Sequence, residues 1–190
     1  MSATARPQRA DARRNRERLL EAAVRAFAAV DGPEATLDAI AKDAGVGIGT
    51  LYRHFPTREA LVEAAYRNEL AKLCHGVTGL LATMPPEAAL RAWMDDFIDY
   101  MTTKRGMADA LRAVIASGGD PYAHSRGSLT GAIRTLLAAG AAAGTVRTDV
   151  EPGDVLASLS GISLTAGDPT QRAQARRLLD LLTDGLRYGS

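Results

Sequence analysis

Apolar residues recur at helical spacing along almost the whole chain. The first clear stripe consists of Leu20, Ala23, Val24 and Phe27, which would share one face of a helix running from about residue 12 to residue 30. Similar stripes follow toward the C-terminal end, and no segment of useful length alternates in the two-residue rhythm of a β-strand. The pattern therefore predicts an all-α protein of about nine helices.

Two short stripes between Thr36 and Phe55 predict a pair of helices joined by a tight turn. Apolar residues spaced three and four apart within 37–44 form the buried face of the first helix. Thr36 stands where its hydroxyl can cap that helix, and Gly45 can end it because glycine adopts the left-handed conformation without steric cost.

The second helix of the pair begins after Gly47, an acceptable cap, and stops before Pro56, which lacks a backbone N–H. Leu51 and Phe55 are four residues apart and are expected to face the first helix. Polar side chains then remain on the outward face. This is the arrangement of a helix-turn-helix, which makes DNA binding the leading hypothesis.

The outward residues of the second helix have the chemistry that DNA contacts require. Thr50, Tyr52 and His54 can donate hydrogen bonds to phosphate oxygens, and Arg53 can reach a phosphate or a guanine edge. Gly49 would let the backbone approach DNA closely. Taken singly, each residue is better explained as an ordinary surface or core residue, and only the spaced set favours DNA binding.

Residues 36–55, together with the PTREAL segment after them, resemble the DNA-binding domain of the tetracycline-repressor (TetR) family. The matching pieces are a cap threonine, the IAxxAGV turn and the GTLYxHF segment. The resemblance implies that the third helix reads the major groove and that the start of the fourth touches phosphate. By position, it places on DNA Ile48, Gly49, Thr50, Tyr52, Arg53 and His54, and on the DNA backbone Thr36, Thr57 and Arg58. Family members often have serine where this chain has Gly47.

The clearest break in the later sequence is the segment 84–86, Met-Pro-Pro. We therefore expect a helix-turn-helix DNA-binding domain over residues 10–56, a long connecting helix over 57–84, and an effector-binding and dimerisation domain over 85–190. The connecting helix and the two-domain plan are also what the TetR resemblance implies.

Charge is distributed unevenly although the net charge is only +1. Residues 1–58 have a net charge of +3 and residues 59–190 a net charge of −2, and six arginines precede Leu19. A basic segment beside a helix-turn-helix suits phosphate neutralisation. The alternative is a solvated arm that aids solubility.

The sequence contains no apolar run long enough to span a bilayer and no targeting pattern. Cys74 is the sole cysteine and cannot form an intramolecular disulfide. His75 follows it directly, so on a helix the two side chains point about 100° apart and are a poor metal or catalytic pair. A cytoplasmic protein with no metal site and no cofactor is expected.

The segment after residue 86 carries no defensible catalytic set, so we predict that the protein is not an enzyme. Bulky side chains in this part could line a pocket for an apolar ligand, although for each residue taken singly plain hydrophobic core is the favoured interpretation. The candidates for ligand binding are Trp93, Phe97, Tyr100, Met101, Met107, Leu111 and Tyr122.

Small residues interleaved with leucines in the last two helices suggest close helix packing between two copies of the chain, as the TetR resemblance also implies. The hypothesis is therefore a homodimeric, ligand-responsive repressor, which an unknown small apolar or amphipathic effector releases from a palindromic operator on double-stranded DNA. The alternatives are a DNA-binding activator, an effector-independent regulator or, less favoured, an α-helical enzyme or adaptor.

Overall fold

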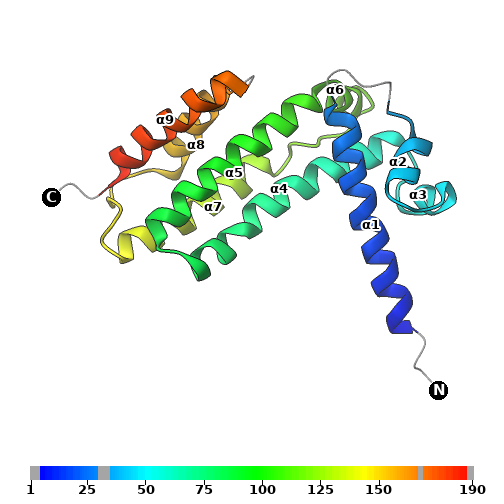
Figure 1. The fold of residues 1–190 in the computed structure, drawn as a ribbon, viewed down its shortest axis with the longest axis horizontal. Coiled ribbons are helices and arrows are strands. Elements are labelled where there is room, and N and C mark those ends of the chain that lie inside the picture. The colour runs from blue at the N-terminus through cyan, green and yellow to red at the C-terminus, as the bar shows by residue number, and fades with distance from the viewer. Residues whose placement is uncertain (1–4, 30–34, 167–168, 188–190) are drawn as a thin grey trace. The chain divides into compact units, whose positions relative to one another are not determined.

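The computed structural model describes residues 5–29, 35–166 and 169–187, and within these ranges the chain forms nine helices (Figure 1). Their bounds are α1 Ala5–Ala28, α2 Leu37–Asp43, α3 Ile48–His54, α4 Arg58–Thr83, α5 Pro86–Gly106, α6 Ala108–Ala116, α7 Ser125–Ala142, α8 Pro152–Ser163 and α9 Pro169–Leu186. The one extended pairing among the described residues is an isolated bridge between Val146 and Arg187. The predicted all-α architecture is confirmed.

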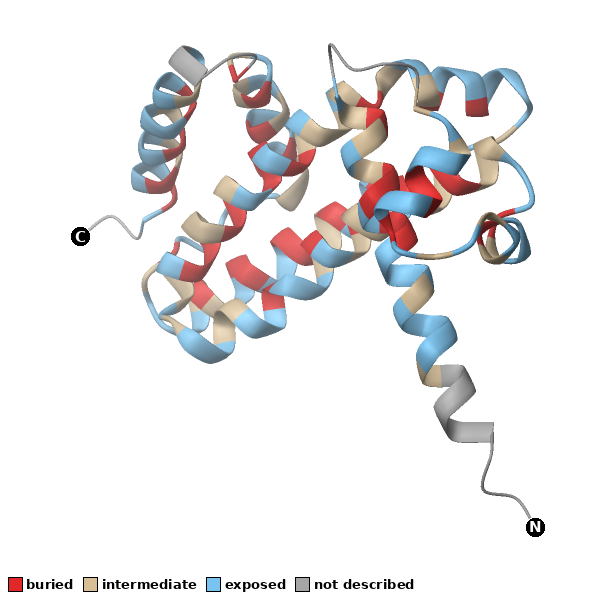
Figure 2. Ribbon diagram, turned by 45° about the vertical axis from the view of Figure 1, so that its right-hand side comes forward, coloured by how far each residue is buried: buried red, intermediate tan, exposed pale blue. Residues whose placement is uncertain are grey.

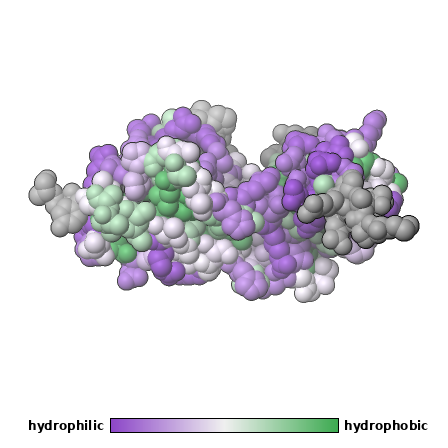
Figure 3. Space-filling model, turned by 90° about the horizontal axis from the view of Figure 1, so that it is seen from below, coloured by the Kyte–Doolittle hydropathy of each residue, from purple (hydrophilic) through white to green (hydrophobic). Residues whose placement is uncertain are grey.

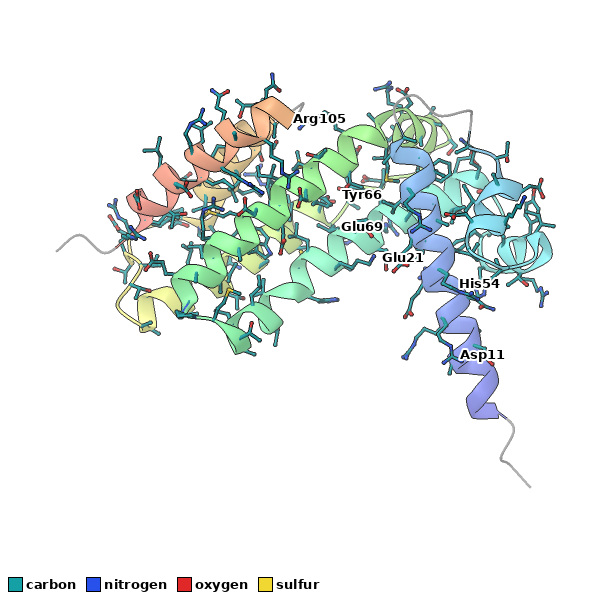
Figure 4. The ribbon with its side chains drawn as sticks, in the orientation of Figure 1. Asp11, Glu21, His54, Tyr66, Glu69 and Arg105 are labelled. Atoms are coloured by element: carbon teal, nitrogen blue, oxygen red, sulfur yellow. The ribbon has the colours of Figure 1, made fainter. Side chains whose placement is uncertain are left out.

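The chain divides into two compact units. The first comprises the residues up to Asn68 together with Thr103–Pro121, and the second comprises Glu69–Thr102 and the residues from Tyr122 onward. The helices α4 and α5 therefore each contribute to both units; Tyr66 and Glu69, labelled in Figure 4, stand on either side of the division within α4.

The helix α1 begins earlier than its apolar stripe predicted. Residues 11–18 are exposed apart from Asn15, so they carry no buried stripe that a pattern search would detect. Charged side chains one turn apart pair along this part of the helix, as in Arg13–Glu17 at 3.7 Å. The predicted end at about residue 30 lies just outside the described residues, and α1 ends at Ala28.

The core of the first unit is built around α1. Leu19, Leu20 and Phe27 from this helix are buried, as are Ile40 of α2 and Leu51 of α3. Figure 2 shows buried residues, in red, on the part of α1 that lies among the other helices of this unit, after a stretch that is mostly pale blue. Burial of these side chains supplies the main favourable free energy that holds the three N-terminal helices together.

The core of the second unit lies along α5. Trp93 and Met94 are fully buried, and they are joined by Ile133 of α7, Leu159 of α8 and Leu179 of α9. The indole N–H of Trp93 donates a hydrogen bond of 3.0 Å to the carbonyl oxygen of Leu73 in α4. The only polar group of this large side chain is therefore satisfied inside the core.

Ion pairs join α9 to α5 across the second unit. Arg91 pairs with Asp180 at 2.9 Å, and Arg187 with Glu87 at 2.6 Å. A third pair joins Arg172 to Asp99. As the residue numbers of the paired side chains rise along α5, those of their partners fall along α9. The charges therefore match when the two helices run antiparallel in this register.

No helix among the described residues has the length and hydrophobicity that a membrane crossing requires. On the face of the molecule drawn in Figure 3, apolar residues (green) form patches among polar ones (purple).

Candidate nucleic-acid interface

The helix-turn-helix begins at Thr36, which caps α2 as the sequence predicted. Its backbone is extended, and its hydroxyl oxygen accepts a hydrogen bond of 3.2 Å from the N–H of Ala39. At the other end of α2, Gly45 has φ = +64°, and its N–H donates to the carbonyl oxygen of Lys42 at 3.0 Å. This left-handed residue ends α2 and turns the chain toward α3.

The helix α3 starts from Gly47, whose carbonyl oxygen accepts from the N–H groups of Thr50 at 2.8 Å and Leu51 at 3.3 Å. Leu51 and Phe55 are buried, as their spacing predicted. Because these two side chains anchor α3 from one side, its remaining residues face away from the core of the unit.

The outward face of α3 is polar and contains no acidic residue. Tyr52 is 50% exposed, a large value for an aromatic side chain, and Gly49 and Arg53 are also exposed. The side chains of Ile48, Thr50 and His54 are partly exposed. Such a face offers hydrogen-bond donors and positive charge without a carboxylate to repel phosphate.

Arg53 lies along its own helix in the structure. Its Nε donates to the carbonyl oxygen of Gly49 at 3.1 Å, and its Nη2 is 3.5 Å from the hydroxyl oxygen of Thr50. Both contacts are exposed and local, so the guanidinium group can leave them for a DNA group without disturbing the core.

The three residues assigned to the DNA backbone occupy different environments. Thr36 and Thr57 are exposed helix caps; the Thr57 hydroxyl oxygen accepts from the N–H of Ala60 at 3.0 Å. Each hydroxyl keeps its own proton for a phosphate oxygen. Arg58 instead turns inward, donating to the carbonyl oxygen of Ala35 and lying 4.8 Å over the ring of Phe27.

Arginines of α1 also contact the protein itself. Arg16 lies 5.3 Å over the ring of Phe55, and Arg25 pairs with Asp43 of α2 at 2.8 Å. These contacts were not predicted, because a linear sequence does not show which distant ring or carboxylate an arginine will meet. The sequence did carry the local signal for the pairing of Arg14 with Asp11, since they are three residues apart.

The residues proposed from sequence to bind a ligand are divided between the two units. Trp93, Phe97 and Tyr100 are buried in the second unit and form a ladder along α5, with ring centroids 5.9 Å and then 6.2 Å apart. Met107 and Leu111 are buried in the first unit. The two remaining candidates, Met101 and Tyr122, are partly exposed residues of the second unit.

Among the described residues, no cluster of three or more His, Cys, Asp or Glu side chains is placed to hold a metal ion.

Two protein families match the chain. Residues 19–65 match the family described as "Bacterial regulatory proteins, tetR family", and residues 85–188 match the one described as "Transcriptional regulator SbtR-like, C-terminal domain". The first match covers α2 and α3 entirely, and the second contains α5 to α9.

Solved structures resemble the chain over nearly its full length. A TetR transcriptional regulator from Streptomyces coelicolor is 60% identical, with a TM-score of 0.87 over 92% of this chain and 99% of that one. A TetR regulatory protein from Mycobacterium vanbaalenii is 36% identical, with a TM-score of 0.78 over 96% of this chain and 100% of that one.

A curated relative matches a shorter part of the chain. TtgW, an uncharacterized HTH-type transcriptional regulator from Pseudomonas putida, is 42% identical over 60 residues, which are 32% of this chain. The match spans 45% of the length of that protein.

Proposed function

We propose that this chain, which belongs to the TetR family of transcriptional regulators, is a homodimeric repressor. In this proposal the repressor leaves its operator when a small molecule binds. Membership of the family makes it a DNA-binding regulator of transcription. The observation that carries the proposal is the exposed face of α3, which contains no acidic residue. The opposite side of the helix is anchored by the buried side chains of Leu51 and Phe55.

In this proposal, α3 lies in the major groove. Tyr52, Thr50 and His54 donate to phosphate oxygens or base edges, and Arg53 exchanges its contacts along α3 for a phosphate or a guanine. Gly49 and Ile48 lie at the start of the helix, where the missing side chain of the glycine permits close approach to the DNA. The hydroxyls of Thr36 and Thr57 bind the flanking backbone.

The outer face of α8 and α9 supports the homodimer. The two helices pack side by side, and exposed residues recur at one-turn spacing at Ala157 and Gly161 of α8 and at Leu164, which directly follows it. On α9, Leu181 is 68% exposed and borders a hollow of about 410 Å³. Leu178 also lines this hollow, together with the polar side chains of Gln174, Arg177, Asp180 and Asp184. An apolar face of this kind is stabilised when a second copy covers it.

A symmetric dimer presents two copies of α3, so the operator should be a near-palindrome. Its half-sites should lie about one helical turn of DNA apart, or a multiple of that. The effector is proposed to enter beside the aromatic ladder of α5, where the rings of Trp93, Phe97 and Tyr100 offer an apolar wall. The effector releases DNA because it binds more tightly to the dimer conformation in which the two copies of α3 cannot reach both half-sites.

The DNA-binding part is tested by selecting sequences from a random DNA pool and measuring their affinity by gel shift. The wild-type protein should enrich a near-palindrome. Tyr52→Ala, on α3, should bind it more weakly. Ile115→Ala, a matched change of a 48% exposed side chain on α6 of the same unit, should bind as the wild type does. Failure to retain any oligonucleotide at low ionic strength, or equal affinity of the two variants, contradicts the proposal.

The effector part is tested by thermal shift with a panel of amphipathic and planar aromatic compounds. A compound that raises the midpoint should also release the selected operator, and Trp93→Phe should change its affinity. A stabilising compound that leaves the operator complex intact contradicts effector-controlled repression while leaving DNA binding unaffected.

A further inference from the structure

We propose that Arg58 is a positioning residue, which holds the start of α2 against α1 and thereby sets how α3 is presented to DNA. The inference rests on the proposed function, and it replaces a phosphate contact, the role that sequence position suggested for this side chain. The first residue of α4 then acts on DNA binding through the protein rather than by touching the nucleic acid.

Three separate segments meet at Arg58. The guanidinium group lies 4.8 Å over the ring of Phe27, near the end of α1. One of its nitrogens, Nη1, donates a partly buried hydrogen bond to the carbonyl oxygen of Ala35. Since Arg58 itself begins α4, a single side chain connects α1, the entry to α2 and α4 within the first unit.

The contact with Ala35 lies beside the cap that starts α2. Ala35 directly precedes Thr36, whose carbonyl and hydroxyl oxygens accept the first hydrogen bonds of α2 from Ile40 and Ala39. A short turn centred on Gly45 then joins α2 to α3. Any shift in the start of α2 is therefore passed on to α3, whose base-edge contacts tolerate little displacement.

The two contacts also explain why arginine stands here. A planar guanidinium can stack on a ring with its face and donate from its edge at the same time. A lysine ammonium can carry the same charge but cannot make both contacts from one rigid plane. To reach a phosphate instead, Arg58 would have to leave both Phe27 and Ala35.

The test compares Arg58→Lys, Arg58→Ala and Phe27→Leu with the wild type on the selected operator, over a series of salt concentrations and well below each unfolding midpoint. Phe27→Leu removes the stacking ring without changing any charge. If Arg58 positions α2, all three variants should lose about tenfold in affinity, or about 1.4 kcal/mol. The slope of log affinity against log salt should stay at the wild-type value, because no phosphate contact is lost.

Arg53→Ala serves as the contrasting variant, since its exposed guanidinium should reach DNA directly and its loss should lower the salt slope by roughly 0.9 if it neutralises a phosphate. In a double-mutant cycle, Phe27→Leu and Arg58→Ala should be less than additive in operator affinity, because they remove the same contact.

Two results would overturn the inference. Full affinity in Arg58→Lys with a lowered slope in Arg58→Ala would make Arg58 a phosphate contact. Lowered unfolding midpoints with wild-type affinity in every folded variant would make it a stability residue alone. A wild-type protein that binds no DNA would instead refute the proposed function. This outcome is seen in the wild-type measurement, before any variant is compared.

Discussion

Gly45 has a backbone conformation that other residues adopt only at a cost. Its φ of +64° lies in the left-handed region, and the N–H groups of Gly45 and Val46 both donate back to α2 from that geometry. The corner of the helix-turn-helix therefore depends on the missing side chain at one position, through backbone freedom rather than through lack of space.

Gly45→Ala should lower the free energy of unfolding by about 1–2 kcal/mol, the cost of placing an L-residue in the left-handed region. Thermal or urea unfolding measures the change. Gly49→Ala is the control: it is helical, an added Cβ meets nothing within 4 Å, and it should leave stability unchanged or slightly raised. Equal destabilisation by both variants would show that the turn does not require glycine at residue 45.

Arg53→Ala should weaken operator binding, because it removes an exposed guanidinium from the centre of the proposed DNA-facing surface. If Arg53 reads a guanine, preference at one base pair should relax by about 1–3 kcal/mol. Affinities for a set of operators with single base changes measure this. A loss that is uniform across all these sequences would assign Arg53 to a phosphate instead.

Asp96 is the clearest pH-sensitive carboxyl of α5. Burial raises the pKa of Asp96 above its ordinary value, and the neighbouring Asp99 and Asp95 raise this pKa further. Between the ordinary and the raised pKa the folded state holds more protons than the unfolded state, so this group favours folding more strongly as the pH falls through that window.

Asp96→Asn should therefore raise the unfolding midpoint at a pH above the raised pKa, where the wild-type carboxylate is charged. The advantage should shrink as the pH falls through the raised pKa and vanish below the ordinary value of 3.8. Midpoints measured over a pH series for both proteins test this. An advantage that is constant with pH would mean that charge is not its cause.

Single side chains were predictable where their partners are close in the sequence. The cap at Thr36 and the burial of Leu51 and Phe55 follow from spacing within one or two helical turns. The orientation of Arg58 was not, because Phe27 and Ala35 belong to other segments and nothing local indicates that they meet it.

At the scale of elements, α9 is held to α5 by both burial and charge. Leu179 and Ala175 of α9 are buried, and the buried hydroxyl of Thr183 in α9 donates to the Sδ atom of Met94 in α5 at 3.8 Å. The three ion pairs between these helices alternate in sign along each of them. Exposed pairs add little stability. Their alternation nevertheless penalises other registers, because a shifted helix would bring like charges together.

Exchanging the charges of one pair tests this register. Asp99→Arg and Arg172→Asp should each lower stability, by less than about 1 kcal/mol for so exposed a pair. The double variant should recover most of the loss, which chemical unfolding of all four proteins in low salt would measure. Losses that simply add would show that the two side chains do not interact in solution.

The ends of α2 and α3 were predicted closely, because a cap, a glycine and a proline mark them locally. Gly106 shows where this reasoning was incomplete. A glycine at this place in the sequence indicates only a helix end, and α5 does end at Gly106, but an added Cβ there would also lie 2.8 Å from the carbonyl oxygen of Ala28. The glycine serves a close approach between α1 and α5, which only the folded chain reveals.

At the scale of the whole molecule, the nine helices of the described residues could be predicted from the sequence, whereas contacts between distant segments could not. Each stripe is a local signal, but the association of residues 103–121 with the N-terminal helices depends on contacts between distant segments. The candidate ligand residues show the same limit: the pattern identified bulky side chains, and the fold then placed Met107 and Trp93 in different units.

The assembly proposed for α8 and α9 is tested by Leu181→Glu, which places a charge on the exposed apolar face of α9. The variant should have the mass of one chain in light scattering and should bind the palindromic operator more weakly, since two half-sites are no longer engaged together. Ile115→Glu, on α6, is the matched control and should remain dimeric. Dimers in both variants would place the interface elsewhere.

Trp93 is an intrinsic fluorophore whose position makes its emission specific to one unit. It is the only tryptophan of the chain, it is fully buried in the second unit, and its N–H is bonded to Leu73. Its fluorescence therefore reports on one half of the protein alone. Melting followed by this emission and melting followed by circular dichroism, which senses every helix, will coincide only if both halves unfold as one cooperative body.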